Sequence, residues 1–155
     1  MILDCTLRDG GYYTHWEFDN DLVQEMVSVL SKSKVDYIEL GYKSPLPGGR
    51  FRKCNDKFIS QLLKDVDYDS HLAFMIDTKD FLENGGINMK LLRDVIKPKF
   101  LSPFTLCRIA TNYETLDETL ELVDIISDLG YQTTVNLMKV ATLTKIAVKE
   151  SLEKL

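Results

Sequence analysis

The chain has 155 residues, a formal net charge of −5 and 45% hydrophobic residues. This composition suits one ordinary globular domain and excludes the disordered and fibrous classes. The acidic balance disfavours nucleic acid as the main partner, because neutralising phosphates requires a concentrated excess of Lys and Arg. No segment approaches the roughly 20 apolar residues of a membrane helix, and the N-terminal residues show no signal pattern. We therefore expect a cytoplasmic protein whose partners are small molecules or proteins, not nucleic acid or membranes.

Five short apolar segments, each followed by a turn signal, are predicted as strands. They are residues 2–8, 35–41, 71–77, 104–110 and 132–138. The amphipathic stretches between them predict helices with one buried stripe each. The first begins after the N-cap candidates Asp19 and Asn20, the third stops at Pro98 and the fourth is closed by Gly130. The last stripe is Leu143, Ile146, Ala147 and Leu152.

Strands that alternate with helices at intervals of about 30 residues predict a parallel sheet with right-handed crossovers. The fold class is therefore α/β. Two architectures remain open: an open five-stranded parallel sheet, or about the first five β/α units of a (β/α)8 TIM barrel. Both build their sites at the carboxyl ends of the strands.

The predicted first strand favours the barrel. Period-two alternation would place Leu3, Cys5 and Leu7 on one face, and Asp4, Thr6 and Arg8 on the other. Helices on both sides of an open sheet would bury those charges at a cost of several kcal/mol each, of order the desolvation of an unpaired polar group. A barrel can hold them in a polar site inside its upper rim.

Polar residues recur at equivalent strand ends along the chain. We expect six of them to converge on one rim: Arg8, Asp9, Glu39, Asp77, Arg108 and Asn136. A set of structural ion pairs is the alternative interpretation. The segment after the second strand is rich in Gly and Pro and carries Lys43, Arg50, Arg52 and Lys53, which suggests a lid over a carboxylate substrate, or else a solvated basic loop.

Two motifs carry a family resemblance. DCTLRDGG at residues 4–11, followed by YIELGY at 37–42, resembles the opening of the DRE-TIM metallolyases. This superfamily includes 4-hydroxy-2-oxovalerate aldolase, 3-hydroxy-3-methylglutaryl-CoA lyase and 2-isopropylmalate synthase. The later strand ends, Cys107 to Thr111 and Val135 to Met138, look like the aldolase branch. The resemblance thus spans residues 1–155, as the N-terminal part of a TIM-barrel aldolase or lyase domain.

The resemblance implies a divalent metal, Mn²⁺ or Mg²⁺, and a 2-oxo acid substrate of the pyruvate type. Asp9 would match the metal-binding aspartate, Arg8 the arginine that stabilises an enolate oxygen, and Glu39 the acidic residue that completes the signature. Arg108 and Asn136, together with Tyr12 and Asp77, would contact substrate. The metal would act as a Lewis acid during formation or cleavage of a carbon–carbon bond.

The sequence departs from the family pattern at the acid–base and metal positions. Tyr12 stands where the aldolases have a histidine, and a free phenol, with a pKa of about 10, is a poor base at neutral pH. The family's His-x-His metal pair has no counterpart, since the histidines are His15, expected in a surface loop, and His71, expected to be structural. We therefore expect this chain by itself to bind metal weakly, to be inactive as an enzyme, and to self-associate through open barrel edges.

Two other function classes fit parts of the pattern. A phosphoacceptor receiver domain could use Asp9, Asp77, Thr111 and Lys139, although it gives no reason for the TLRDG string or for Glu39. A scaffold derived from the aldolase fold, without its metal site, is the third interpretation. The cysteines, Cys5, Cys54 and Cys107, are expected to be reduced thiols, because they are odd in number and lack CxxC spacing.

Overall fold

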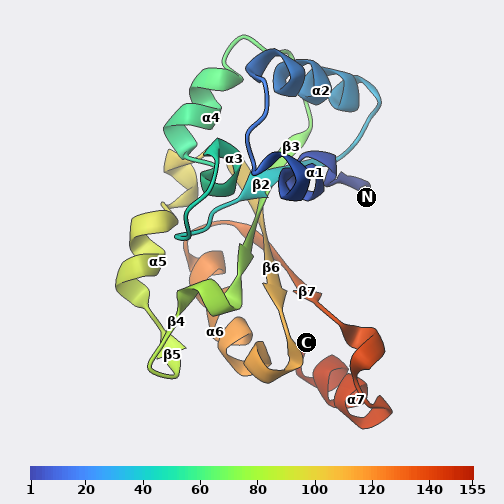
Figure 1. Ribbon diagram of the computed structural model, residues 1–155, viewed down its shortest axis with the longest axis vertical. Coiled ribbons are helices and arrows are strands. Elements are labelled where there is room, and N and C mark those ends of the chain that lie inside the picture. Colours follow the sequence, from blue (N-terminus) through green and yellow to red (C-terminus); the bar gives the residue numbers. More distant parts are fainter.

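The computed structural model describes residues 1–155 and contains fourteen helices and strands besides four short 3₁₀ turns (Figure 1). In the N-terminal half, the elements are β1 (Leu3–Asp4), α1 (Thr6–Thr14), α2 (Asn20–Lys32), β2 (Tyr37–Tyr42), α3 (Arg50–Lys53), α4 (Asp56–Leu62) and β3 (His71–Asp77). They are followed by β4 (Leu82–Glu83), β5 (Gly86–Ile87), α5 (Met89–Val95), β6 (Phe104–Thr111), α6 (Leu116–Asp128), β7 (Gln132–Leu137) and α7 (Lys145–Lys154). None of the helices has the length and apolar character that a bilayer crossing requires.

The main sheet has five strands in the order β1-β2-β3-β6-β7, and every neighbouring pair is parallel. Chain order and spatial order are therefore the same. A doubly wound sheet reverses its order at a switch point, and receiver domains have the order 2-1-3-4-5. This strand order excludes the open doubly wound sheet and the receiver topology. Each new strand is added at the same edge of the sheet, as in a TIM barrel. The small β4–β5 hairpin is antiparallel and was not predicted.

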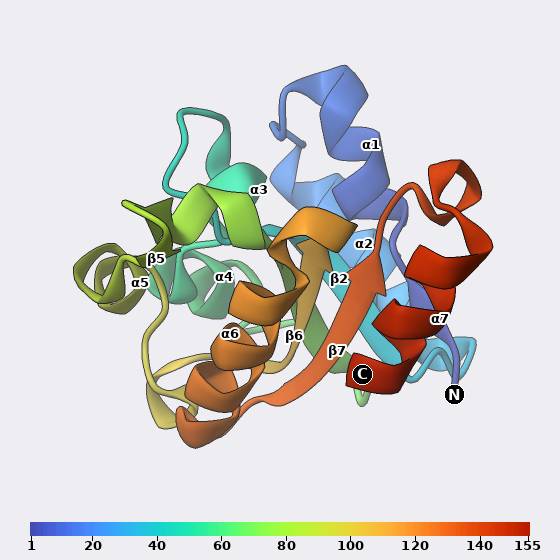
Figure 2. The same cartoon turned by 90° about the horizontal axis from the view of Figure 1, so that it is seen from below.

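Contacts across the sheet show that it is curled into part of a barrel. The hydroxyl of Tyr37 on β2 donates to Oε1 of Gln132 on β7 at 2.6 Å, although β3 and β6 lie between these strands. Neighbouring strands are about 4.8 Å apart, so side chains standing on a flat sheet could not meet across three such intervals. The prediction of an incomplete (β/α)8 barrel is confirmed. Figure 2 shows the splayed, curved strands with α4, α5 and α6 along one side.

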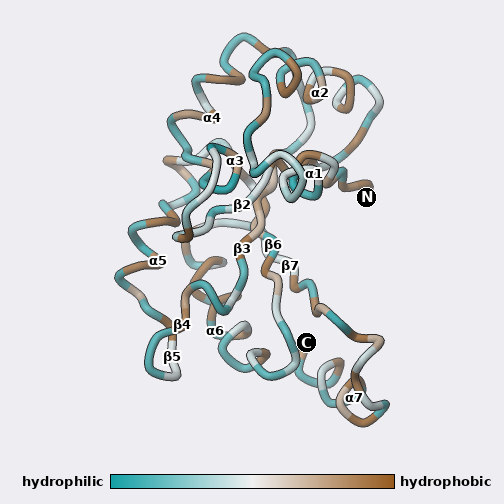
Figure 3. Tube along the Cα trace, in the orientation of Figure 1, coloured by the Kyte–Doolittle hydropathy of each residue, from teal (hydrophilic) through white to brown (hydrophobic).

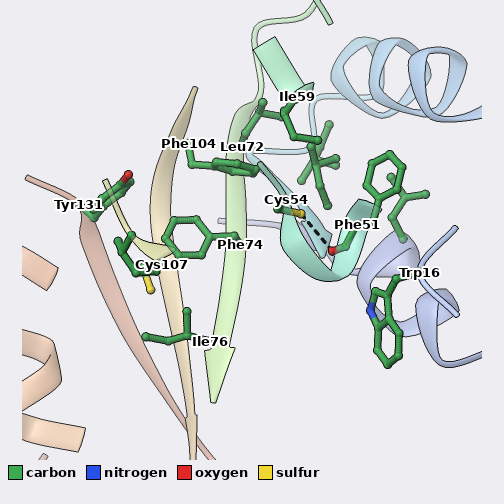
Figure 4. Packing of buried hydrophobic residues seen from close by; sticks show 14 of the residues in the cluster. Trp16, Phe51, Cys54, Ile59, Leu72, Phe74, Ile76, Phe104, Cys107 and Tyr131 are labelled. Carbon is green, nitrogen blue, oxygen red and sulfur yellow. Dashed lines mark hydrogen bonds between the residues drawn. The ribbon is translucent and has the colours of Figure 1, made fainter. Parts of the chain in front are cut away.

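The hydrophobic core lies between the convex face of this sheet and the helices. Strand residues such as Leu72, Phe74 and Ile76 of β3 pack with helix residues in a cluster of 23 buried side chains. The helices contribute Val23, Val27, Ile59, Leu62, Leu92, Leu122 and Ile126. Figure 4 shows the aromatic centre of this layer, where Phe74 meets Phe104 and Tyr131 edge to face. Figure 3 shows hydrophilic and hydrophobic residues alternating along the helices, as expected for helices that bury one face against the sheet.

The predicted helix boundaries are largely confirmed. The Asp19 carboxylate accepts from the backbone N–H groups of Asp21 and Leu22 and so caps α2. Gly130 follows α6 with φ of +94°, the left-handed conformation that glycine adopts without a steric penalty. The stripe predicted in the last helix is wrong, because Ile146 and Leu152 are 71% and 69% exposed. Helix α7 is attached mainly by polar contacts, from Tyr113 to Glu150 and from Lys154 to Asp117.

The first predicted strand is also wrong in extent. Only Leu3–Asp4 is extended, and α1 begins at Thr6, so Arg8 and Asp9 lie on a helix. The Asp4 carboxylate accepts from both the backbone N–H and the hydroxyl of Thr6. This local bond turns the chain out of the strand, a competition with the sheet ladder that Asp side chains favour. The two-face argument from strand alternation therefore does not apply beyond Asp4.

Candidate active site

A β-bulge in β2 determines which side chains lie on the concave face of the sheet. The register with β3 shifts between Glu39, which pairs with Ala73, and Gly41, which pairs with Phe74. Leu40 is the extra residue. Strand side chains alternate, so Glu39 and Tyr42 would point to opposite faces of a regular strand. The shift places both on the face opposite to the core residue Phe74, because Tyr42 pairs with Met75.

Glu39 is the centre of the site. Its carboxylate is 0% exposed, and its Oε2 accepts from Arg8 Nε at 3.1 Å and from Arg108 Nη1 at 2.7 Å. Arg8 comes from α1 and Arg108 from β6, so one carboxylate ties together three elements. A buried charge is tolerated when it is paired in this way. Glu39 Oε1 has no hydrogen-bond partner, which leaves one buried acceptor unused at the centre.

The two guanidinium groups keep donors free on the concave side. Arg8 uses Nε for Glu39 and Nη1 for Asp9, while Arg108 uses Nη1 for Glu39 and, at 3.9 Å, the Cys5 thiol. The other guanidinium nitrogens of both side chains make no hydrogen bond within the protein. Burial lowers the pKa of Arg8, but the Glu39 carboxylate outweighs this effect and the net pKa is raised. Arg8 therefore stays fully charged and can bind an anion.

Two tyrosines stand beside this cluster. The hydroxyls of Tyr12 on α1 and Tyr42 at the end of β2 are 2.9 Å apart. Burial, followed by the hydrogen bond with Tyr12, raises the pKa of Tyr42 well above its usual range. Tyr42 is therefore protonated at neutral pH, and the pair can donate a hydrogen bond but is a poor base.

A pocket of about 180 Å³ opens next to the tyrosine pair. Its lining residues come from α1 and the segments after β2 and β3, and they are Tyr12, Trp16, Tyr42, Leu46, Arg52, Asp77, Lys79 and Asp80. Asp77 ends β3 and pairs with Lys79 Nζ at 2.8 Å. The structure thus places Asp77 on the predicted rim, but in this pocket, and no hydrogen bond or ion pair joins it to the arginine cluster.

The remaining predicted site residues are dispersed. Asn136 lies on β7 opposite Ala110 and makes no side-chain hydrogen bond. Asp9 forms a side-chain ion pair with Arg8 alone, and its side chain is 61% exposed. The structure therefore brings Arg8, Glu39 and Arg108 into direct contact, adds Asp9 through Arg8, and leaves Asn136 apart.

The predicted anion lid is wrong for most of its basic residues. Lys43 is 1% exposed and pairs with Asp56 at 2.7 Å, and Arg50 is held by Glu17 at 2.8 Å. Lys53 Nζ donates to three backbone carbonyls, those of Ser44, Pro45 and Leu46. Of these four basic residues, only Arg52 lines the pocket beside the tyrosine pair. These side chains fix the loop and α3 in place.

The structure also tests whether the residues present can hold a metal. It contains no group of three or more His, Cys, Asp or Glu side chains arranged as ligands. Asp9 is a single carboxylate already paired with Arg8, and Glu39 is engaged by two arginines. His71 begins β3, exposed and beside Tyr37, and His15 is an exposed residue after α1. The residues of this chain by themselves do not form a complete Mn²⁺ or Mg²⁺ site.

Sequence reasoning missed two residues near the site, Tyr42 and Trp16, and named Arg52 only as part of the basic loop. Tyr42 ends the quoted YIELGY string, but its role depends on the bulge, which no sequence pattern indicated. Arg52 stacks on Trp16, with its guanidinium carbon 4.7 Å from the ring centroid. The three cysteines are free, as predicted, and burial raises the pKa of Cys54 and Cys107 far above the usual range, so these thiols are inert.

No family model matches the chain. A 4-hydroxy-2-oxovalerate aldolase of Mycolicibacterium paratuberculosis is 25% identical over 144 residues, which cover 85% of this chain and 36% of that protein. A 4-hydroxy-2-oxohexanoate aldolase of Mycobacterium bovis is 25% identical over 154 residues, 92% of this chain and 39% of that protein. The chain therefore spans less than two-fifths of these relatives.

A solved structure shares the fold. It is the N-terminal domain of a protein designated as an aldolase from Bacteroides vulgatus, with a TM-score of 0.78 and 23% identity over 99% of this chain and 59% of that one. The sequence relatives and this structure fit a partial aldolase of the DRE-TIM type. These comparisons confirm the resemblance to aldolases that the TLRDG and YIELGY strings indicated.

Proposed function

We propose that this chain contributes the enolate-stabilising part of a metal-dependent aldolase or lyase that acts on 4-hydroxy-2-oxo acids. The observation that carries the proposal is the buried Glu39 carboxylate, which holds Arg8 and Arg108 side by side at the carboxyl end of the curled sheet. Catalytic residues of TIM barrels lie at this end. The aldolase relatives, which share this part of the chain, support the same assignment.

The chemistry needs positive charge at a defined oxygen. When the C3–C4 bond of a 4-hydroxy-2-oxo acid breaks, its electron pair moves onto C3 and the 2-oxo oxygen, and an aldehyde leaves. The proton lost from the C4 hydroxyl is balanced by the proton that C3 gains when the enolate becomes a 2-oxo acid. Arg8 would stabilise the enolate oxygen, since a preorganised donor at a developing charge is worth about 10²–10³ in rate.

The other residues would position the substrate. Arg108 has Nε and Nη2 unengaged and can bind the substrate carboxylate through two parallel hydrogen bonds. Glu39 orients both guanidinium groups without touching substrate. Asp9 is the candidate metal ligand of this chain, and Asn136 a candidate second-substrate contact. A metal, when bound, would polarise the 2-oxo group, but one carboxylate of this chain would hold it weakly.

Oxalate, a planar dianion that resembles the enolate of pyruvate, provides the test. We expect the purified chain to bind oxalate in isothermal titration calorimetry without added metal. Arg8→Ala and Arg108→Ala should each weaken binding by about tenfold or more, because a charge-assisted hydrogen bond contributes about 1.5–3 kcal/mol. Arg93→Ala, on the exposed side of α5, is the matched control and should bind as the parent does.

Turnover gives a separate outcome. Because the ligand set is incomplete, we expect pyruvate release from 4-hydroxy-2-oxovalerate to stay near background with Mn²⁺ or Mg²⁺. Oxalate binding that is absent, or insensitive to Arg8→Ala, would contradict the proposal and favour a scaffold without a site. Full metal-dependent turnover by this chain would instead overturn the expectation of weak metal binding.

A further inference from the structure

The pocket beside the tyrosine pair has a lining that the proposed chemistry at Glu39 does not use. Tyr12 lies one helical turn after Arg8 on α1, and the Tyr42 hydroxyl bonds to Tyr12, so the pocket adjoins the arginine cluster. A substrate bound through its 2-oxo acid group at Arg8 would extend its far end toward this pocket. The chemistry of the pocket lining would therefore select the aldehyde that the proposed reaction releases or accepts.

Charges of both signs face this pocket. Asp77 and Asp80 supply acceptors, while Arg52 and Lys79 supply donors. Arg52 Nε has no hydrogen-bond partner in the protein, so its N–H is free to donate to a ligand. Asp80 is half-buried and accepts from the Ser44 hydroxyl at 2.9 Å, and this fixes its carboxylate. The two carboxylates and the two cations balance, so the lining favours a neutral ligand, and hydroxyl groups can both donate and accept here.

The rest of the lining is aromatic. The rings of Tyr12 and Trp16 meet edge to face at 4.7 Å, Trp16 and Tyr42 at 6.1 Å, and Leu46 is the one aliphatic residue of the pocket. Aromatic faces combined with fixed polar groups suit the C–H faces and hydroxyls of a polyol. A simple alkyl chain would desolvate these charged groups and leave Arg52 Nε without a partner, at a cost in binding.

We infer that this pocket binds a polyhydroxylated chain, so that the aldehyde partner of the proposed reaction is a small sugar-like hydroxyaldehyde. The inference rests on the proposed aldolase function and specifies its second substrate class. It differs from the substrates that the relatives' names denote, 4-hydroxy-2-oxovalerate and 4-hydroxy-2-oxohexanoate, which carry only a methyl or ethyl group beyond C4.

Binding of stable alcohols tests this inference without turnover. Erythritol and 1-butanol have equal carbon counts and differ in hydroxyl number, and saturation-transfer NMR of the purified chain reports on both. We expect a signal for erythritol and none for 1-butanol at equal concentration. Arg52→Gln and Asp80→Asn should each weaken erythritol binding by about tenfold, the loss of one charge-assisted hydrogen bond. Lys57→Gln, an exposed residue outside the pocket, should change nothing.

Oxalate binding, measured on the same samples, separates the two claims. It should persist in Arg52→Gln and Asp80→Asn, which also shows that these variants are folded. If oxalate binds while erythritol does not, or if 1-butanol binds as well as erythritol, the polyol inference is overturned and the proposed function stands. If erythritol binds with unchanged affinity in both variants, this pocket is not the polyol site and the inference fails. If oxalate does not bind, the proposed function itself fails.

Discussion

Glu39 is the residue on which the candidate site depends. A carboxylate with 0% exposure is stable only because two guanidinium groups share its Oε2 atom. Removing one member of such a buried cluster leaves uncompensated charge, so the loss exceeds the net contribution of the pair. The same carboxylate fixes where both arginines point, and stability and positioning therefore cannot be separated at this residue.

Glu39→Gln should lower the free energy of unfolding by about 3–5 kcal/mol, because it leaves two buried arginines facing a neutral amide. Urea denaturation followed by circular dichroism measures this change. Glu153→Gln breaks the exposed Lys149–Glu153 pair of α7 and should cost at most about 0.5 kcal/mol. Equal effects of the two substitutions would show that the Glu39 cluster is solvated.

Asp80 predicts a pH dependence of stability. Burial raises its pKa in the folded state, partly opposed by the hydrogen bond from Ser44. A raised pKa means that the stability contribution is fully present below the ordinary value of about 3.9 and is lost as pH rises through the folded pKa. Asp80→Asn removes this term. The urea midpoint of the variant minus that of the parent should therefore be more positive at pH 7 than at pH 4, and an unchanged difference would contradict the assignment.

At the scale of elements, the bulged strand β2 decides the geometry of the site. After the bulge, Gly41 lies against α3 so closely that a Cβ would be 1.9 Å from the carbonyl oxygen of Phe51. The fixed basic side chains of the loop hold α3 in this position, and α3 in turn supplies Arg52 to the pocket. A regular strand with a larger residue at position 41 could place neither Tyr42 nor Arg52 where they are.

Gly41→Ala should therefore lower the free energy of unfolding by about 3 kcal/mol or more, at the upper end for overpacked positions. Thermal unfolding provides the measurement, with Gly86→Ala as the matched control. Gly86 has open space around its Cβ position and should change stability by less than about 0.5 kcal/mol. A Gly41→Ala protein as stable as the Gly86 control would mean that α3 moves away at no cost.

At the scale of the whole molecule, the curled sheet ends in two strands without outer partners. Strand β1 has only two residues, whereas β7 has six and leaves a longer edge open. Helix α7, which follows β7 in the chain, exposes Ile146 and Leu152. Unpaired strand edges and exposed apolar side chains favour pairing with another chain.

We therefore expect concentration-dependent self-association of this chain in sedimentation velocity. Replacing Ile146 and Leu152 together by Lys should weaken it by about tenfold or more, since full burial of one such side chain contributes about 1.5–3 kcal/mol. Val29→Lys changes an exposed apolar residue of α2 and should leave association as it was. A chain that stays monomeric at all accessible concentrations would contradict this expectation.

Sequence patterns alone predicted the class of fold, the four later strands, most helices and the candidate residues Arg8, Asp9, Glu39 and Arg108. Apolar periodicity, caps such as Asp19 and Gly130, and the TLRDG string depend only on residues close together in the chain. Such features can therefore be recognised in the sequence before the fold is known. The folded structure was needed to show that Arg8 lies on a helix, because the Asp4 carboxylate accepts hydrogen bonds from Thr6 and ends the strand. It also decided that Glu39 and Tyr42 share a face, since the bulge arises from pairing between β2 and β3. Contacts between residues far apart in the chain produce no periodic pattern in the sequence, so they could not be predicted from it.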